Sequence, residues 1–162
     1  MRGESKIIHN EKVDIEHLEK IGFYISKCLF PGAKILLFGE LGTGKTTLAS
    51  AIINGLSNEE IIVTSPTFSL IKVYATNPTV YHIDLYRLSD VSEIEYLDIF
   101  SDPTAIYIIE WADMLSYLTP DESLNIYLFY NIDIRYRDIT IEGKGEKYKL
   151  IEEELSKKIK VV

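Results

Sequence analysis

Apolar and polar residues alternate along this chain with two periods, one typical of helices and the other of strands. Apolar positions recur at helical spacing after Asp14, which we expect to cap a first helix, and Pro31-Gly32 ends that helix. A short apolar run over 33–38 predicts a buried strand, and helical spacing returns over 46–56 until an Asn-Gly pair. The first third of the chain therefore predicts strands and helices in alternation.

Most of the remaining segments look like strands. Strands are predicted over 5–9, 61–63, 68–74, 79–85, 105–110, 124–130 and 135–142, and helices over 90–100 and 148–160. We expect the segments 68–74 and 79–85 to pair, because both alternate in polarity and a short loop joins them. Alternating elements early and successive strands late indicate an α/β fold with a mixed central sheet. Without repeats or linkers, residues 1–162 are expected to form a single domain.

The connection between the strand 33–38 and the helix 46–56 carries a glycine-rich motif. Residues 39 to 46 read Gly-Glu-Leu-Gly-Thr-Gly-Lys-Thr and match the pattern G-x-x-x-x-G-K-[ST] at every fixed position. Its glycines let consecutive backbone N–H groups point at a phosphate at a helix N-terminus. Strand, loop and helix together predict a three-layer P-loop NTPase fold that binds a nucleoside triphosphate. The expected nucleotide-binding residues are Gly39, Glu40, Leu41, Gly42, Thr43, Gly44, Lys45, Thr46 and Thr47.

Two side chains at the end of the motif supply charge and a metal ligand. Lys45 brings a point charge to the β and γ phosphate oxygens. Thr46 can place its hydroxyl on a Mg²⁺ ion that bridges the same phosphates. The sequence therefore predicts a nucleotide bound together with magnesium.

The predicted strand 105–110 ends in Glu110, which is the main acidic candidate. Nucleotide hydrolases bring an acid to the magnesium ion from a buried strand beside the phosphate loop. Glu110 could bind the ion directly, bind it through water or orient the attacking water, and an ordinary strand-end acid is the structural alternative. Trp111 follows it, and we consider two positions for its ring, a wall of the nucleotide site or the core.

The predicted strand 79–85 and the residues after it present one polar face. Side chains alternate along a strand, so His82, Asp84 and Tyr86 share a face while Ile83, Leu85 and Arg87 share the other. Asp84 could serve as a second acid near magnesium or orient water. His82 and Arg87 could contact phosphate or fix the loop, although a structural histidine and a locally paired arginine are the simpler interpretations.

A further candidate is the turn Ser65-Pro66-Thr67. Its hydroxyls flank a rigid proline soon after a predicted strand, as in a loop that senses a γ-phosphate and changes between ordered and loose states. A proline turn closed by side-chain hydrogen bonds explains the same residues equally well.

Composition excludes several other functions. The net charge of −8 argues against broad contact with DNA or RNA, since such affinity comes from lysines and arginines. No apolar run approaches the length of a membrane span and the N-terminus is too polar for a signal peptide, so a cytoplasmic protein without a membrane partner is expected. Cys28 is the single cysteine, which leaves no disulfide, and we interpret it as core packing.

Taken together, four segments resemble the TsaE (YjeE) family of bacterial P-loop ATPases over most of the chain. They are the phosphate loop 39–47, Ser-Pro-Thr-Phe-Ser-Leu at 65–70, Tyr-His-Ile-Asp-Leu-Tyr-Arg-Leu at 81–88 and Ile-Glu-Trp at 109–111. The resemblance implies ATP hydrolysis that supports threonylcarbamoylation of adenosine 37 in tRNA. It also implies TsaB and TsaD as protein partners, after TsaC has prepared the threonylcarbamoyl adenylate, with the ATPase resetting the complex between turnovers and tRNA reached only through it.

Site roles also follow from the resemblance. It implies that Thr46 and Glu110 bind Mg²⁺, that Lys45 binds phosphate and that Asp84 is needed for function, so Lys45, Asp84 and Glu110 are the catalytic candidates. Val13, Asp14 and the loop around Gly143 would flank the base.

The chain departs from the family pattern at two places. Ala112-Asp113 stand where Pro-Glu is usual, and Asp98 stands where a glycine is expected. These departures concern the surface that contacts the partner proteins more than the nucleotide site.

Two other functions compete with this interpretation. A P-loop small-molecule kinase shares the loop and the size, but such kinases bring several arginines to the transferred group, and the chain has only Arg2, Arg87, Arg135 and Arg137. A nucleotide-gated binding module with negligible turnover would use ATP only to order the loop 65–67 for a partner, and Glu110 would then be a ligand and not a catalyst. A GTPase is disfavoured because the Asn-Lys-x-Asp segment is missing.

Overall fold

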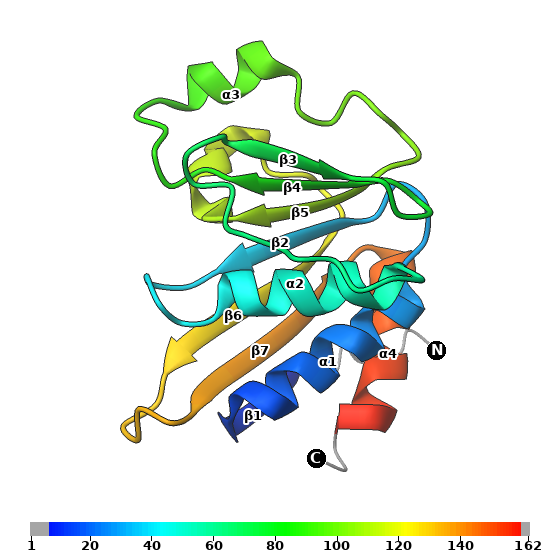
Figure 1. Ribbon diagram of the computed structural model, residues 1–162, viewed down its shortest axis with the longest axis vertical. Coiled ribbons are helices and arrows are strands. Elements are labelled where there is room, and N and C mark those ends of the chain that lie inside the picture. Colours follow the sequence, from blue (N-terminus) through cyan, green and yellow to red (C-terminus); the bar gives the residue numbers. More distant parts are fainter. Residues whose placement is uncertain (1–6, 160–162) are drawn as a thin grey trace.

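The computed structural model describes residues 7–159, and all of its strands join one seven-stranded sheet (Figure 1). The strands are β1 (Ile8–Val13), β2 (Lys34–Phe38), β3 (Ile71–Tyr74), β4 (Val80–Asp84), β5 (Ile106–Glu110), β6 (Ser123–Tyr130) and β7 (Arg137–Lys144). The helices are α1 (Ile15–Cys28), α2 (Lys45–Leu56), α3 (Val91–Leu97) and α4 (Glu146–Ile159), with a 3₁₀ segment η1 (Ala112–Leu118).

The sheet is mixed, as predicted, with the order β1-β7-β6-β2-β5-β4-β3. The four inner strands β6, β2, β5 and β4 run parallel, whereas β3 joins one side and β7 and β1 the other in antiparallel pairs. Within the parallel part, Leu37 of β2 and Asp84 of β4 both lie beside Glu110 of β5. The carboxyl ends of these strands therefore meet at one edge, where α/β sheets bind ligands.

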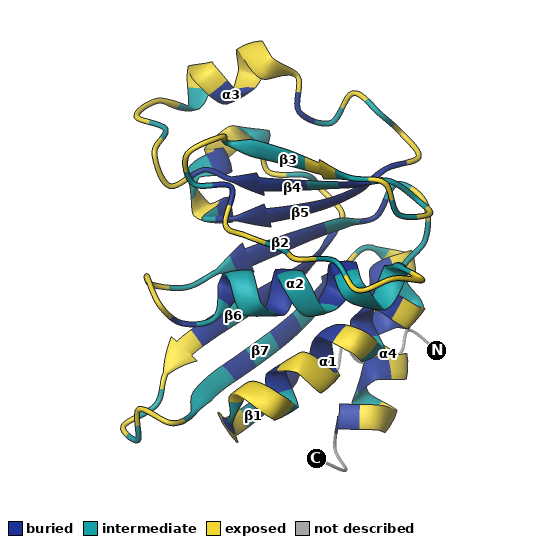
Figure 2. Cartoon of the chain, viewed as in Figure 1, coloured by how far each residue is buried: buried dark blue, intermediate teal, exposed yellow. Residues whose placement is uncertain are grey.

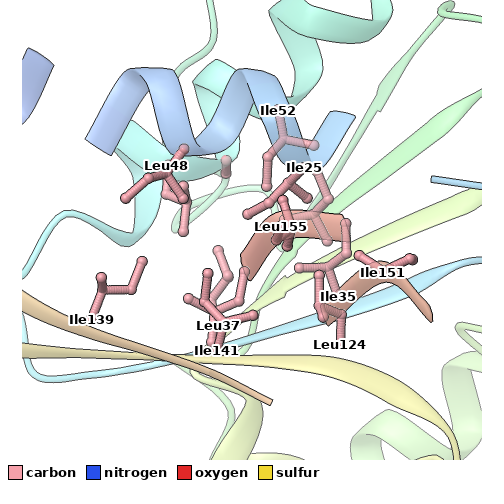
Figure 3. Packing of buried hydrophobic residues seen from close by; sticks show 14 of the residues in the cluster. Ile25, Ile35, Leu37, Leu48, Ile52, Leu124, Ile139, Ile141, Ile151 and Leu155 are labelled. Atoms are coloured by element: carbon pink, nitrogen blue, oxygen red, sulfur yellow. The ribbon is translucent and has the colours of Figure 1, made fainter. Parts of the chain in front are cut away.

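Helices cover both faces of the sheet and complete the predicted three layers. The residues of α1, α2 and α4 pack with one face in a continuous apolar core (Figure 3). On the opposite face, Ile94 of α3 and Leu115 of η1 pack with Leu36, Ile83 and Ile109 in a second cluster. Figure 2 shows the inner strands buried along most of their length, with the end of β6 exposed, whereas α3 lies at the rim with most of its surface exposed. Parallel strands must be apolar on both sides when both are covered, which explains their continuous apolar runs.

The start of the chain agrees with the predicted helix and differs at the strand. The carboxylate of Asp14 accepts a hydrogen bond from the backbone N–H of His17 at 2.8 Å, so the predicted N-cap of α1 is confirmed. The first strand runs later than the predicted 5–9, over Ile8–Val13, because it continues until it meets Arg137 at the start of β7. Residues 5 and 6 of that prediction lie outside the described residues.

The predicted strand 61–63 is wrong. These residues form a loop after α2, and the side-chain amide of Asn54 binds the backbone of the first of them. The backbone N–H of Ile61 donates to Asn54 Oδ1 at 2.8 Å, and Asn54 Nδ2 donates to the Ile61 carbonyl at 3.0 Å. The backbone groups of Ile61 thus have their hydrogen bonds satisfied within eight residues of sequence.

The remaining predicted elements exist with shifted ends. The pair β3–β4 begins only at Ile71, because the N–H groups of Ser69 and Leu70 both bond to the Pro66 carbonyl in a turn. Helix α3 is shorter than the predicted 90–100 and stops at Asp98, whose φ of 46° is left-handed. Helix α4 starts two residues earlier than predicted, and the last residue of that prediction, residue 160, is not among the described ones. Within residues 7–159, no helix is long and apolar enough to cross a membrane.

Candidate functional site

The motif between β2 and α2 forms a glycine cradle. Gly39 adopts a φ of 154° and Gly44, at the N-cap of α2, a φ of 106°. A Cβ atom on Gly39 would lie 2.6 Å from the Leu128 carbonyl oxygen, and one on Gly44 would lie 3.0 Å from a methyl group of Leu18. Only glycine allows this backbone path, and it leaves the N-terminus of α2 open toward the edge of the sheet.

Lys45 lies inside the cradle and is only 4% exposed. Its ammonium group donates to the carbonyl oxygens of Gly39 and Glu40, each at 2.7 Å, and lies 4.3 Å from the centre of the Trp111 ring. Burial lowers the pKa of Lys45, and the nearby carboxylates of Glu110, Asp84 and Asp113 oppose that change. The site therefore holds a desolvated positive charge that the loop's own oxygens partly satisfy.

Thr46 and Glu110 meet across the start of α2 and the end of β5. Thr46 Oγ1 donates to Glu110 Oε1 at 2.8 Å, and Glu110 is only 2% exposed. Mg²⁺ takes oxygen ligands, commonly one or two from protein and the rest from phosphates and water. The hydroxyl and carboxylate fit that pattern. Among the described residues, no cluster of three His, Cys, Asp or Glu side chains could hold a metal, so such an ion would depend on the phosphates.

The second oxygen of Glu110 is bound by His82. His82 Nε2 lies 2.6 Å from Glu110 Oε2, and the imidazole is fully buried. The alternation of β4 correctly predicts that His82 and Asp84 share a face, since His82 contacts Glu110 and Asp84 lines the same cavity as Glu110. The contact between His82 and Glu110 was missed, because it depends on β4 lying beside β5.

Asp84 fixes the turn 65–67 to the site. Thr67 Oγ1 donates to Asp84 Oδ2 at 2.9 Å and Ser65 Oγ does so at 3.3 Å. The other oxygen, Oδ1, accepts from the backbone N–H of Tyr86 at 2.9 Å. The predicted side-chain hydrogen bonds of the proline turn are thus present, and they connect that turn to the acid at the end of β4.

Trp111 lies at the site and not in the interior of the core. It adopts a left-handed φ of 57° directly after β5, and its ring lies 4.7 Å from that of Tyr86. A cavity of about 290 Å³ opens here between the phosphate loop and these strand ends. Its lining contains Leu41, Gly42, Gly44, Lys45, Thr46, Thr47, Ser65, Thr67, Asp84, Tyr86, Glu110 and Trp111. Most of the candidate residues from the sequence therefore converge on one cavity.

Two supports of the phosphate loop were not predicted. The hydroxyl of Tyr130, at the end of β6, donates to the Leu41 carbonyl, and Arg137 Nη2, at the start of β7, donates to the Gly42 carbonyl at 3.1 Å. Neither residue belongs to a local motif, and Arg137 is 95 positions away from Gly42 in the sequence, so no sequence pattern pointed to them. Arg87 places its guanidinium 4.0 Å from the ring of Phe68 and does not line the cavity.

The segment around Gly143, which the resemblance places beside the nucleotide base, lies away from the phosphate loop. Gly143 is not in a loop but inside β7, paired with Leu124 at the start of β6, and the phosphate loop follows the opposite ends of the parallel strands. A Cβ atom there would lie 2.2 Å from the Tyr148 carbonyl oxygen, so the glycine serves the packing of α4. Val13 does lie at the phosphate-loop edge, where it pairs with Arg137.

A parallel inner sheet, a glycine cradle at the N-terminus of a helix, a buried lysine and a strand-end acid define a P-loop nucleotide-binding protein. A family model described as "Threonylcarbamoyl adenosine biosynthesis protein TsaE" matches residues 13–139. The chain therefore belongs to the TsaE family, as its resemblance indicated.

Individual relatives agree with this assignment. The TsaE protein of Bacillus subtilis is 38% identical over 128 residues, which cover 78% of this chain and 80% of the relative. The TsaE protein of a Nostoc species is also 38% identical, over 72% of this chain and 75% of its own. A solved structure titled "Crystal structure of Bacillus subtilus YdiB" superposes with a TM-score of 0.76 at 29% identity, covering 94% of this chain and 96% of the other.

Proposed function

We propose that this chain binds Mg-ATP and hydrolyses it to support threonylcarbamoylation of tRNA adenosine 37 by a complex of TsaB and TsaD. The observation that carries the proposal is the contact of Thr46 with Glu110 at 2.8 Å, beside Lys45 and in the same cavity. A hydroxyl from the phosphate loop and an acid from the neighbouring strand are the two protein groups that P-loop NTPases use around their metal ion.

Each residue of the cavity has a defined task in this proposal. Lys45 exchanges the carbonyl oxygens of Gly39 and Glu40 for the β and γ phosphate oxygens when ATP binds. Thr46 and Glu110 hold Mg²⁺, which offsets the negative charge on the phosphates when bound. The backbone N–H groups at the start of α2 bind phosphate oxygens. Trp111 and Tyr86 supply an aromatic part of the cavity wall.

Two roles are proposed for Asp84, and in both its carboxylate holds the turn 65–67 in the absence of nucleotide. Its carboxylate either orients the attacking water or anchors the turn through Thr67. The cavity is lined by Ser65 and Thr67 together with Lys45, so a γ-phosphate bound by the lysine would meet their hydroxyls. We infer that the phosphate competes with Asp84 for these hydroxyls and thereby changes the turn.

Partners are proposed from the family and from charge. A net charge of −8 disfavours direct binding of tRNA, which supports a role through the protein partners TsaB and TsaD. We infer a cytoplasmic location from that role in tRNA modification.

The kinase alternative gains no support from the cavity. No described arginine lines it, since Arg87 stacks on Phe68, Arg135 is paired with Asp133 and Arg137 bonds to the loop backbone. A transferred phosphoryl group would therefore lack the arginines that such kinases use.

The test is ATP hydrolysis by the purified chain alone and with TsaB and TsaD, compared with Lys45→Ala and Glu110→Ala. We expect weak activity alone, stimulation in the complex and a large loss in both variants. Transfer of phosphate to a small acceptor would favour the kinase. Normal hydrolysis by Glu110→Ala would contradict the mechanism, and ATP binding without turnover in the complex would favour the nucleotide-gated module.

A further inference from the structure

We propose that His82 is a positioning residue that holds the carboxylate of Glu110 in the orientation needed to bind Mg²⁺. This inference rests on the proposed function, because it assigns Glu110 to the metal ion. His82 does not itself line the cavity, and its one hydrogen bond to a lining residue is the bond to Glu110, so it acts through Glu110.

The sheet register brings the two side chains together. Strands β4 and β5 are parallel neighbours in which His82 pairs with Ile108 and Asp84 pairs with Glu110. Side chains two positions apart share a face, so the imidazole lies beneath the carboxylate on the side that faces α2. The distance of 2.6 Å from Nε2 to Oε2 is that of a strong, charge-assisted hydrogen bond.

Glu110 therefore receives one donor on each oxygen. His82 Nε2 binds Oε2 from below at 2.6 Å, and Thr46 Oγ1 binds Oε1 from the loop at 2.8 Å. A glutamate side chain has three rotatable bonds, and its terminal torsion is broad when nothing restrains it. The bond from His82 restrains that torsion and leaves Oε1 directed at Thr46, where the metal ion is proposed to bind.

The surroundings also define the hydrogen on the imidazole. An ionised carboxylate only accepts hydrogen bonds, so Nε2 carries the proton. Among the described residues, His82 Nδ1 is the one buried side-chain nitrogen or oxygen atom without a hydrogen-bond partner. The bond to Glu110 is therefore the one side-chain hydrogen bond that the described structure gives to this imidazole.

Outer-shell partners of metal ligands commonly account for 10–100-fold in metal affinity or activity, and His82 has the geometry of such a partner. Loss of the bond frees the carboxylate to turn away from Thr46. Binding of nucleotide without metal depends instead on Lys45 and the loop backbone, which His82 does not touch. The expected signature is a weaker affinity for Mg²⁺ with unchanged binding of nucleotide in the absence of metal.

Three variants separate positioning from simple loss of structure. His82→Gln can place an amide N–H near the position of Nε2, His82→Asn ends near Nδ1 and falls short of Glu110, and His82→Phe fills the space without a donor. The measurements are binding of a fluorescent ATP analogue in EDTA and in a Mg²⁺ titration, and hydrolysis in the complex with TsaB and TsaD across Mg²⁺ concentrations.

We expect His82→Asn and His82→Phe to raise the Mg²⁺ concentration for half-maximal binding and hydrolysis by about tenfold or more. His82→Gln should restore most of that loss, and the affinity in EDTA should stay within about twofold for all three, since the lysine and loop contacts remain. Equal Mg²⁺ dependence in wild type and all variants would overturn the proposal, as would failure of His82→Gln to differ from His82→Asn.

Two further measurements keep the test decisive if a variant folds poorly. In the Glu110→Gln variant, adding His82→Asn should not change the Mg²⁺ dependence further, because His82 acts on the metal ion only through the Glu110 carboxylate. An additive effect of the two substitutions would contradict the proposal. Nitrogen NMR of the metal-free protein should show the Nε2-protonated tautomer of His82, and the opposite tautomer would also contradict it. If the wild type itself shows no Mg²⁺-dependent binding or hydrolysis, the proposed function fails and this inference fails with it.

Discussion

Thr46 Oγ1 donates a hydrogen bond of 2.8 Å to Glu110 Oε1, which joins the phosphate loop to the end of the neighbouring strand β5. The two residues are 64 positions apart in the chain. Their contact exists because β2 and β5 are parallel neighbours, with Leu37 beside Glu110. The pair defines where a metal ion is proposed to bind.

Replacing Thr46 by Val, which keeps the shape and removes the hydroxyl, should raise the Mg²⁺ concentration for half-maximal hydrolysis by about tenfold or more, because a proposed ligand is lost. Thr46→Ser is the matched control and should stay close to wild type. The measurement is hydrolysis in the complex with TsaB and TsaD during a Mg²⁺ titration. Similar curves for the Val and Ser variants would show that the hydroxyl is not a ligand.

Lys45→Met should weaken ATP binding by about 10–100-fold, the usual contribution of hydrogen bonds to a charged group.

The same substitution should also change how the free energy of unfolding depends on pH. Burial lowers the pKa of Lys45 in the folded protein, so between that pKa and the unfolded value the unfolded chain binds more protons, and stability rises with pH. The unfolding free energy of wild type should therefore improve relative to Lys45→Met as pH rises through that window.

The control for this pH dependence is Lys149→Met, because Lys149 is exposed on α4. Chemical denaturation at a series of alkaline pH values measures both differences. A constant difference between wild type and Lys45→Met across the series would show that burial of the ammonium group has little effect on its ionisation.

Thr67→Val should loosen the turn 65–67, because Thr67 donates to the carboxylate of Asp84 at 2.9 Å. Hydrogen bonds to charged groups contribute about 1.5–3 kcal/mol, so local opening should become about 10–100-fold more frequent. Hydrogen exchange of the backbone amides around Pro66 measures this opening. Ser65→Ala should have a smaller effect, since the corresponding distance is 3.3 Å. The reverse ranking of the two variants would contradict the role assigned to Thr67.

Gly22→Ala should destabilise the fold although alanine favours helices. A Cβ atom on Gly22 of α1 would lie 2.5 Å from Ala51 Cβ of α2 and 3.2 Å from the Leu48 carbonyl oxygen. Overpacking costs about 1–3 kcal/mol, whereas the gain in helix propensity is about 0.5–1 kcal/mol, so we expect a net loss of about 1–2 kcal/mol. The double variant Gly22→Ala/Ala51→Gly removes the closest contact and should recover part of the loss. Urea denaturation decides between these outcomes.

Much of the fold was predictable because its patterns are local. Helix α1 follows from apolar spacing and from Asp14, whose capping bond spans three residues. The strand 61–63 could not be excluded in the same way, because the residues have high strand propensity and only the folded chain brings Asn54 against the Ile61 backbone. Strand propensity does not include the side-chain amide that the end of the preceding helix places beside Ile61, which is why the prediction failed there.

The site likewise combines local features, which the sequence predicts, with contacts between distant residues, which it does not. The sequence by itself determined the phosphate loop with Lys45 and Thr46, because every group in that cradle lies within eight residues and its shape depends on glycines in the same segment. It also predicted that Glu110 ends a buried strand. The tertiary structure alone decided that Glu110 meets both Thr46 and His82, and that Arg137 supports the loop. Such contacts depend on strand order and register, which the packing of the whole sheet selects and no short segment encodes.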